Sequence, residues 1–219
     1  MLPIEPELHH RIESGRSFPL HVWRFADPVR AIASGPLGGG LGERHWVINA
    51  SVHRGYDRLD PDDHLTELAT SFDLTGPGVG LLTAVDVNHA VAADDQGVRV
   101  TATVGLGYPT WAAAPPDPER NAHPVGTINI VALIPAPLTD AALVNAVATA
   151  TEAKVQALCE RDVQATGTAS DAIIVACVRT GAVRDPFGGP RSTWGSRLAR
   201  AVHAAVDIGI VHWADRSGR

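Results

Sequence analysis

Two unbroken apolar runs constrain the fold of this chain more than any other feature of its sequence. They are Ile128–Ile134 and Ala172–Val178, and a segment with helical spacing separates them. A strand with one face in water alternates apolar and polar residues, whereas a continuous apolar run is typical of a strand covered on both faces. The second half of the chain is therefore predicted to follow a β-α-β-α order.

Two long helices are predicted in this half. The first begins at Thr139 or Asp140 and runs to about Arg161, and the second covers roughly residues 192–208. Hydroxyl and carboxylate side chains at such starting positions accept hydrogen bonds from the free N–H groups of a first helical turn.

The first half is predicted to be rich in strands, with one short helix at 62–72 capped by Asp62 or Asp63. Val98–Val104 alternates in polarity after a turn signal, so it should pair with Leu81–Ala93 as a hairpin or meander. The other predicted strands are Leu20–Ala26 and Val29–Ser34, hinged at Asp27-Pro28, and His45–Val52. Strands first and helices later favour an α+β fold. We expect a layered mixed β-sheet packed by two long C-terminal helices and one short helix, in a single domain over 1–219.

The amino-acid composition limits the kinds of molecule that this protein is expected to bind. Eighteen Lys and Arg residues against 24 Asp and Glu give a net charge of −6, which disfavours nucleic acid and anionic membranes as partners. The apolar runs are shorter than the ~20 residues that span a bilayer. Cys159 and Cys177 sit in apolar contexts where reduced thiols are usual, so a cytoplasmic protein is expected. The histidines show no metal-ligand spacing, and residues 112–124 are predicted to form a long surface loop.

Lys154 is the only lysine in the chain, beside 17 arginines. Helical spacing places it on the same stripe as Leu143, Val147 and Leu158, towards the core or a pocket. One interpretation is a lysine that extends its charge to the surface near the helix end. The other is a functional ammonium, and if buried it needs a carboxylate or several acceptors nearby.

The segment Thr166–Asp171 supplies hydroxyls and a carboxylate at the mouth of a buried strand. Such groups could position a water or a nucleophile, or they could simply cap backbone amides in a turn. The run Gly35–Gly42 could expose backbone to a ligand, but a tight connection between strands is its default interpretation. His53, His89 and Tyr108 lie near predicted strand ends, and nothing in the sequence ranks them.

Several stretches, taken together and in order over roughly Ser34 to Val206, resemble the adenosylcobinamide amidohydrolase family of corrinoid salvage. They are Gly38-Gly39-Gly40, Val47–Val52, Leu82–Ala84, Ala102–Gly105, Gly126–Ile130, Thr151–Lys154, Ala165–Asp171, Phe187–Pro190 and Thr193–Gly195. The resemblance implies hydrolysis of the amide that joins aminopropanol to the corrin ring, giving adenosylcobyric acid for cobalamin salvage. Cobalt would arrive as part of the substrate, so no metal or other cofactor is expected.

A second similarity concerns the site. Gly126-Thr127-Ile128, Leu138–Ala142 and Thr168–Asp171 are similar in order to the ornithine acetyltransferase type. In that type, a threonine at the position of Thr127 is a nucleophile exposed by self-cleavage. The similarity implies a layered α/β fold around a mixed sheet and a site location; self-cleavage is not expected here.

These considerations place the site where the starts of the two apolar strands meet Lys154. Asp171 would orient or deprotonate the attacking group, and Thr127 or Thr168 would be the nucleophile or hold a water. Lys154 would stabilise an oxyanion or keep Asp171 ionised. The predicted substrate-binding residues are Gly39, Gly40, Asn49, Asn129 and Thr193. Alternatives are a non-catalytic corrinoid-binding protein and an amidohydrolase of another corrinoid or amide; a homo-oligomer also stays open.

Overall fold

The computed structural model describes residues 4–116, 126–181 and 184–218. In these residues, eight strands form one mixed sheet in the order β4-β3-β2-β8-β7-β6-β5, and β1 pairs with β2. The strands are β1 (Glu7–Glu13), β2 (Arg16–Ala33), β3 (Gly40–Ser51), β4 (Gly78–Thr83), β5 (Val91–Asp95), β6 (Val98–Gly105), β7 (Thr127–Ile134) and β8 (Ala172–Cys177). The helices are α1 (Pro61–Ser71), α2 (Asp140–Glu160) and α3 (Thr193–Ser217), with a 3-10 turn at Val87–His89.

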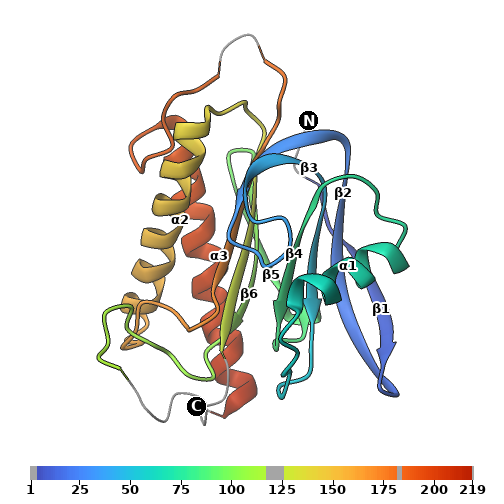
Figure 1. Cartoon of the computed structure of the whole chain (residues 1–219). Helices are drawn as coiled ribbons and strands as arrows, with labels where there is room; N and C mark the ends of the chain where they lie inside the picture. The colour runs from blue at the N-terminus through green and yellow to red at the C-terminus, as the bar shows by residue number, and fades with distance from the viewer. Residues whose placement is uncertain (1–3, 117–125, 182–183, 219) are drawn as a thin grey trace.

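The sheet folds over on itself, so that β3 and β4 face β7 and β8 across an apolar interior that includes Val47, Val79, Val131 and Ile174 (Figure 1). Helices α2 and α3 cover the outer face of one half, and α1 covers the outer face of the other. Both faces of β7 are thus buried, which explains why its sequence is apolar except for Thr127 and Asn129. The predicted α+β fold, a layered mixed sheet with two long helices and one short helix, is confirmed.

Strand β2 connects the two halves of the sheet. It pairs with β3 along most of its length, with β1 through its first part and with β8 through Arg30–Ala33. Its register with β3 shifts between Arg24 and Val29, around the predicted hinge at Asp27-Pro28. The prediction of two separate strands was therefore wrong, because the irregularity bends one continuous strand instead of ending it.

Three other boundaries differ from the predictions. Helix α1 begins at Pro61, one residue before the predicted range, because proline suits the first turn of a helix, where its missing N–H is not needed. Of the segment predicted to pair with β6, only β5 does so, since β4 pairs in parallel with β3; the other neighbour of β6 is β7. Helix α3 continues past Ile208 because Gly209 and Ile210 extend its buried face.

Residues 7–13, near the start of the chain, form an edge strand on β2. The predicted loop at 112–124 lies partly outside the described residues. Within the described part of the chain, no helix is both long and apolar enough to cross a membrane.

Candidate active site

A cavity of about 370 Å³ opens between the two halves of the sheet, where β3 and β4 end and β7 and β8 begin. Its walls come from five places along the chain, which only the folded sheet brings together. The lining residues are Ser34, Pro36, Val52, His53, Arg54, Tyr56, Pro61, Leu81, Leu82, Thr83, Ala84, Thr127, Asn129, Ser170, Asp171 and Ala172. Three of the predicted site residues, Thr127, Asn129 and Asp171, are among them.

Asp171 ties the beginnings of β7 and β8 together. Its Oδ1 accepts hydrogen bonds from the Ile128 N–H at 2.9 Å and the Thr168 hydroxyl at 2.5 Å. Its Oδ2 accepts from the Thr168 N–H at 3.1 Å and from the Lys154 ammonium at 2.5 Å. Two backbone amides, one hydroxyl and one ammonium therefore surround this carboxylate, and the predicted caps at this turn are present.

Of the two interpretations of Lys154, the structure agrees with the buried ammonium and not with a charge that extends to the surface. Lys154 lies in the second half of α2 and is only 5% exposed. Its Nζ contacts Asp171, in agreement with the expectation that a buried ammonium needs a carboxylate nearby. Lys154 does not line the cavity: it approaches Asp171 from the helix layer, whereas the cavity lies between the sheet halves.

A pair of hydroxyls faces the cavity beside Asp171. Thr127 Oγ1 lies 2.8 Å from Ser170 Oγ, and Ser170 Oγ donates to the Gly126 carbonyl at 2.9 Å. Because the Ser170 proton is directed to that carbonyl, the Thr127 hydroxyl donates to Ser170. The Thr168 hydroxyl lies between Asp171 Oδ1, to which it donates its proton, and the same Gly126 carbonyl oxygen. Thr168 does not line the cavity.

Asn129 lines the cavity and has a buried hydrogen-bond acceptor without a partner among the described residues. Its Nδ2 donates to the Leu82 carbonyl and to Asn49 Oδ1, both at 2.9 Å. A carbonyl only accepts, so the amide nitrogen must face Leu82 and the oxygen must face away. Asn129 Oδ1 is buried and has no partner among the residues the structure describes. An unsatisfied buried acceptor in a cavity wall is a binding position for a ligand N–H or O–H. Asn49 is also buried and supports Asn129 without lining the cavity itself.

Three predicted substrate-binding residues lie outside this cavity. Thr193 is exposed at the first turn of α3, in the outer helix layer. Gly39 and Gly40 are exposed where the chain enters β3. The glycine run serves backbone packing instead: a Cβ at Gly38 would lie 1.9 Å from the Gly78 carbonyl oxygen. These glycines therefore allow the connection to approach β4 closely, which was the default interpretation.

Sequence reasoning missed the loop that follows β3. His53, Arg54 and Tyr56 line the cavity from this loop. His53 had been one of three unranked residues, whereas His89 and Tyr108 do not line the cavity. The loop has no periodicity or motif that sets it apart, so only the folding of the sheet reveals its position.

The packing around the ion pair predicts the effect of a single added methyl group. A Cβ at Gly167 would lie 2.2 Å from Asp171 Oδ2 and 2.5 Å from Lys154 Nζ. We expect Gly167→Ala to lower the free energy of unfolding by about 1–3 kcal/mol, because overpacking displaces the ion pair. Urea unfolding measures this, with Gly189→Ala as the matched control, since its new Cβ would first meet a side-chain oxygen of Asn145 at 3.0 Å. Equal stability of the two variants would contradict a tightly packed pair.

The fold and the cavity define a layered α+β protein with a half-open, partly polar cavity of small-molecule size between two β-layers. The family model for adenosylcobinamide amidohydrolase matches residues 5–218. The chain therefore belongs to the adenosylcobinamide amidohydrolase family, as the resemblance of its sequence implied.

Individual relatives agree with this assignment. An adenosylcobinamide amidohydrolase from Methanosarcina mazei is 29% identical over 82% of this chain and 89% of its own length. One from Halobacterium salinarum is 39% identical over 58% of this chain and 55% of its own length. The crystal structure of the PH0078 protein from Pyrococcus horikoshii OT3 has a TM-score of 0.51 at 12% identity, covering 94% of this chain and 84% of that chain. This last similarity concerns the fold alone.

Proposed function

We propose that this protein hydrolyses the amide that joins aminopropanol to the corrin ring of adenosylcobinamide, giving adenosylcobyric acid for cobalamin salvage. Membership of the family supports the reaction class. The observation that carries the location is the hydroxyl pair of Thr127 and Ser170, which faces the cavity where β7 and β8 begin. Hydrolysis of an amide requires an attacking oxygen, and these are the hydroxyls that the cavity offers beside a buried carboxylate.

The size of the cavity indicates which part of the substrate enters it. Small-molecule sites usually enclose ~300–1,000 Å³, and this one, at about 370 Å³, is at the lower end. A corrin macrocycle with its amide arms and adenosyl group is too large for such a space. The proposal therefore places the aminopropanol arm in the cavity and the macrocycle at its mouth, beside exposed His53 and Arg54.

Within the cavity, we assign the attack on the amide carbon to the Thr127 oxygen. Thr127 begins β7 and is 3% exposed, so its position is set by the strand and by Ser170. Asn129 lies two residues further along the same face of β7, and its unpartnered Oδ1, which is buried until the cavity wall adjusts to the substrate, would accept the N–H of the substrate amide. This bond would hold the carbonyl carbon near the start of the strand.

Asp171 and Lys154 have a positioning role in this proposal. The four donors around Asp171 leave it poorly suited to take a proton from the attacking group. The buried ammonium stabilises the charged carboxylate, which in turn fixes the backbone on both sides of the hydroxyl pair. Of the roles considered for these two residues, orienting the attacking group and keeping Asp171 ionised agree best with the geometry.

The activity is tested by incubating the protein with adenosylcobinamide and measuring released aminopropanol and adenosylcobyric acid. Release at a rate proportional to protein concentration is expected. Tight binding of adenosylcobinamide without release would instead support a corrinoid-binding protein. We also propose that cobalt enters only with the substrate, so activity should persist after dialysis against a chelator, and zinc-dependent recovery would contradict this.

A further inference from the structure

The hydroxyl pair leaves one chemical requirement of amide hydrolysis unmet. The attacking oxygen must lose a proton, and the leaving nitrogen must gain one, because an amide anion is a very poor leaving group. Asp171 is fully engaged by other donors, and the Ser170 proton is directed to a backbone carbonyl. A second set of groups at the cavity must therefore move this proton.

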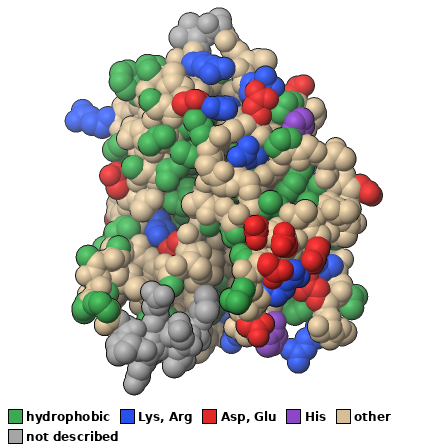
Figure 2. Space-filling view, in the orientation of Figure 1, with side chains coloured by type: hydrophobic (Ala, Val, Ile, Leu, Met, Phe, Trp, Pro, Cys, Tyr) green, Lys and Arg blue, Asp and Glu red, His purple; other side chains and the backbone are tan. Residues whose placement is uncertain are grey.

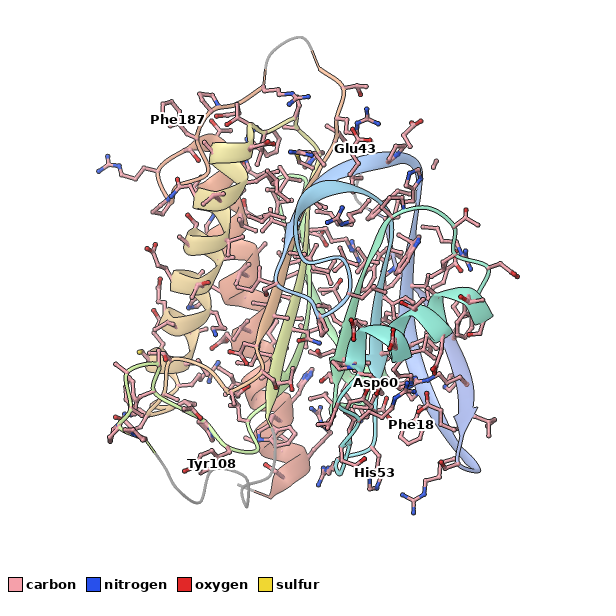
Figure 3. All side chains as sticks on the ribbon, viewed as in Figure 1. Phe18, Glu43, His53, Asp60, Tyr108 and Phe187 are labelled. Atoms are coloured by element: carbon pink, nitrogen blue, oxygen red, sulfur yellow. The ribbon has the colours of Figure 1, made fainter. Side chains whose placement is uncertain are left out.

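Such a set lies in the part of the cavity wall that the loop after β3 forms. Tyr56, in the loop after β3, lines the cavity, and its hydroxyl lies 3.0 Å from Nδ1 of His64. His64 belongs to the first turns of α1 and is 5% exposed. Its Nε2 lies 2.9 Å from Oε1 of Glu13, the last residue of β1. In Figure 3 the loop that carries Tyr56 runs between the labelled His53 and Asp60, near Phe18 of the β1–β2 hairpin.

The hydrogen bonds determine which nitrogen of His64 carries the proton. Glu13 also accepts from Arg11 Nε at 2.5 Å. Burial alone would raise the pKa of Glu13, but the hydrogen bonds from Arg11 and His64 outweigh burial and hold its pKa below the ordinary value. An ionised carboxylate only accepts, so His64 Nε2 donates to Glu13. In the neutral form of this imidazole, the lone pair at Nδ1 accepts the hydroxyl proton of Tyr56.

Arg58, two residues after Tyr56, is already paired with acidic side chains. Arg58 forms ion pairs with Asp60 at 2.7 Å and with Glu67 at 2.9 Å. These groups belong to the acidic surface over α1, which Figure 2 shows at the lower right. Burial raises the pKa of the Tyr56 phenol in spite of the nearby Arg58, so the phenol keeps its proton at neutral pH.

We propose that Tyr56 is a catalytic residue of this enzyme, which relays a proton between the attacking oxygen and the leaving nitrogen, with His64 and Glu13 as positioning residues behind it. The proposal rests on the proposed hydrolysis of adenosylcobinamide. During attack, the new C–O bond forms while the O–H proton passes to Tyr56 Oη and the phenol proton passes to His64 Nδ1. During collapse, the C–N bond breaks while Tyr56 protonates the nitrogen and His64 returns its proton to the phenol. One proton moves from oxygen to nitrogen, and the acyl group is left on Thr127 as an ester. A water then attacks this ester through the same relay, which returns a proton to the Thr127 oxygen and releases adenosylcobyric acid.

The test compares two substrates with different leaving groups. One is adenosylcobinamide, whose amine must be protonated, and the other is the p-nitrophenyl ester of adenosylcobyric acid, whose leaving group departs as an anion. We expect Tyr56→Phe to lower kcat for the amide by ~10²-fold or more, and to lower kcat for the ester at least about tenfold less. If Tyr56 had a purely structural role, Tyr56→Phe would lower kcat for both substrates by the same factor, and that result would overturn the proposal.

Two further variants make the test independent of the folding of Tyr56→Phe. Glu13→Gln keeps the size of the side chain but can donate to His64 Nε2, which favours the tautomer with a proton on Nδ1. We expect this variant to show the same preference for the ester at little change in KM. Tyr108→Phe removes the only other phenol, which does not line the cavity, and should leave the ratio of the two activities unchanged.

The outcomes also separate this proposal from the one it rests on. Wild-type protein that releases no aminopropanol would overturn the proposed function itself. Wild-type protein that is active, combined with folded Tyr56→Phe and Glu13→Gln variants of undiminished amide turnover, would overturn the relay alone.

Discussion

Replacing Lys154 with methionine is expected to lower the free energy of unfolding by about 3–5 kcal/mol. The Lys154 and Asp171 side chains are only 7% and 12% exposed, so the ammonium is the main compensation for a buried carboxylate. Methionine has a similar volume but leaves that carboxylate without its cation. Three hydrogen-bond donors remain around Asp171, but none of them carries a charge.

Chemical unfolding of the purified variant measures this effect. The matched control is Arg161→Met at the end of the same helix, where Arg161 pairs with Asp207 through two hydrogen bonds of 2.5 and 2.7 Å. That pair is more exposed, at 44% and 24% of the side chains, and should contribute no more than about 1 kcal/mol. A Lys154→Met variant as stable as the control would contradict the structural importance of the buried pair.

The same substitution should reduce activity in molecules that remain folded. Asp171 holds the backbone on both sides of the hydroxyl pair, so a displaced carboxylate would displace Thr127 and Ser170. Lys154→Arg is expected to behave similarly, because the space beside Nζ is too narrow for a planar guanidinium: even a Cβ at Gly167 would come within 2.5 Å. Normal aminopropanol release by a folded Lys154→Arg variant would show that activity requires the positive charge at this position but not the shape of the lysine side chain.

The second large effect is expected for Thr127→Val, which removes one hydroxyl and conserves the branched shape of the side chain. If the Thr127 oxygen attacks the substrate, kcat for adenosylcobinamide should fall by ~10³-fold or more. The loss of one hydrogen bond to Ser170 should cost only about 1 kcal/mol of stability. The prediction is therefore a folded protein that has lost its activity, measured by melting and by aminopropanol release.

Three companion variants make this result specific. Thr127→Ser keeps the hydroxyl and should retain much of the activity. Ser170→Ala should be less damaging than Thr127→Val, and the reverse order would transfer the role of nucleophile to Ser170. Thr101→Val alters a buried threonine on neighbouring β6 that does not line the cavity, and should leave kcat nearly unchanged. Thr127→Val activity within tenfold of the wild type would refute the assignment.

The local pattern of apolar and polar residues was sufficient to predict many of the strands and helices of this protein. The buried strands β7 and β8, the helix between them and the inward direction of Lys154 follow from residue periodicity over short windows. The requirement that a buried ammonium has a carboxylate nearby then pointed to the segment that contains Asp171. Each of these inferences depends on neighbours in the sequence or on the energy of one isolated charge.

The tertiary structure alone decided how the two halves of the chain meet. Strand β4 pairs with β3, and the folded sheet brings the loop at Tyr56 to the same cavity as Thr127, with His64 hydrogen-bonded to Tyr56 and Glu13 to His64. The same folding leaves Thr193 and the glycine run outside the cavity. Strand pairing and sheet packing depend on side-chain contacts between residues far apart in sequence, and short-range periodicity carries no information about them. The sequence therefore determined the elements and one half of the candidate site, whereas long-range packing determined the other half.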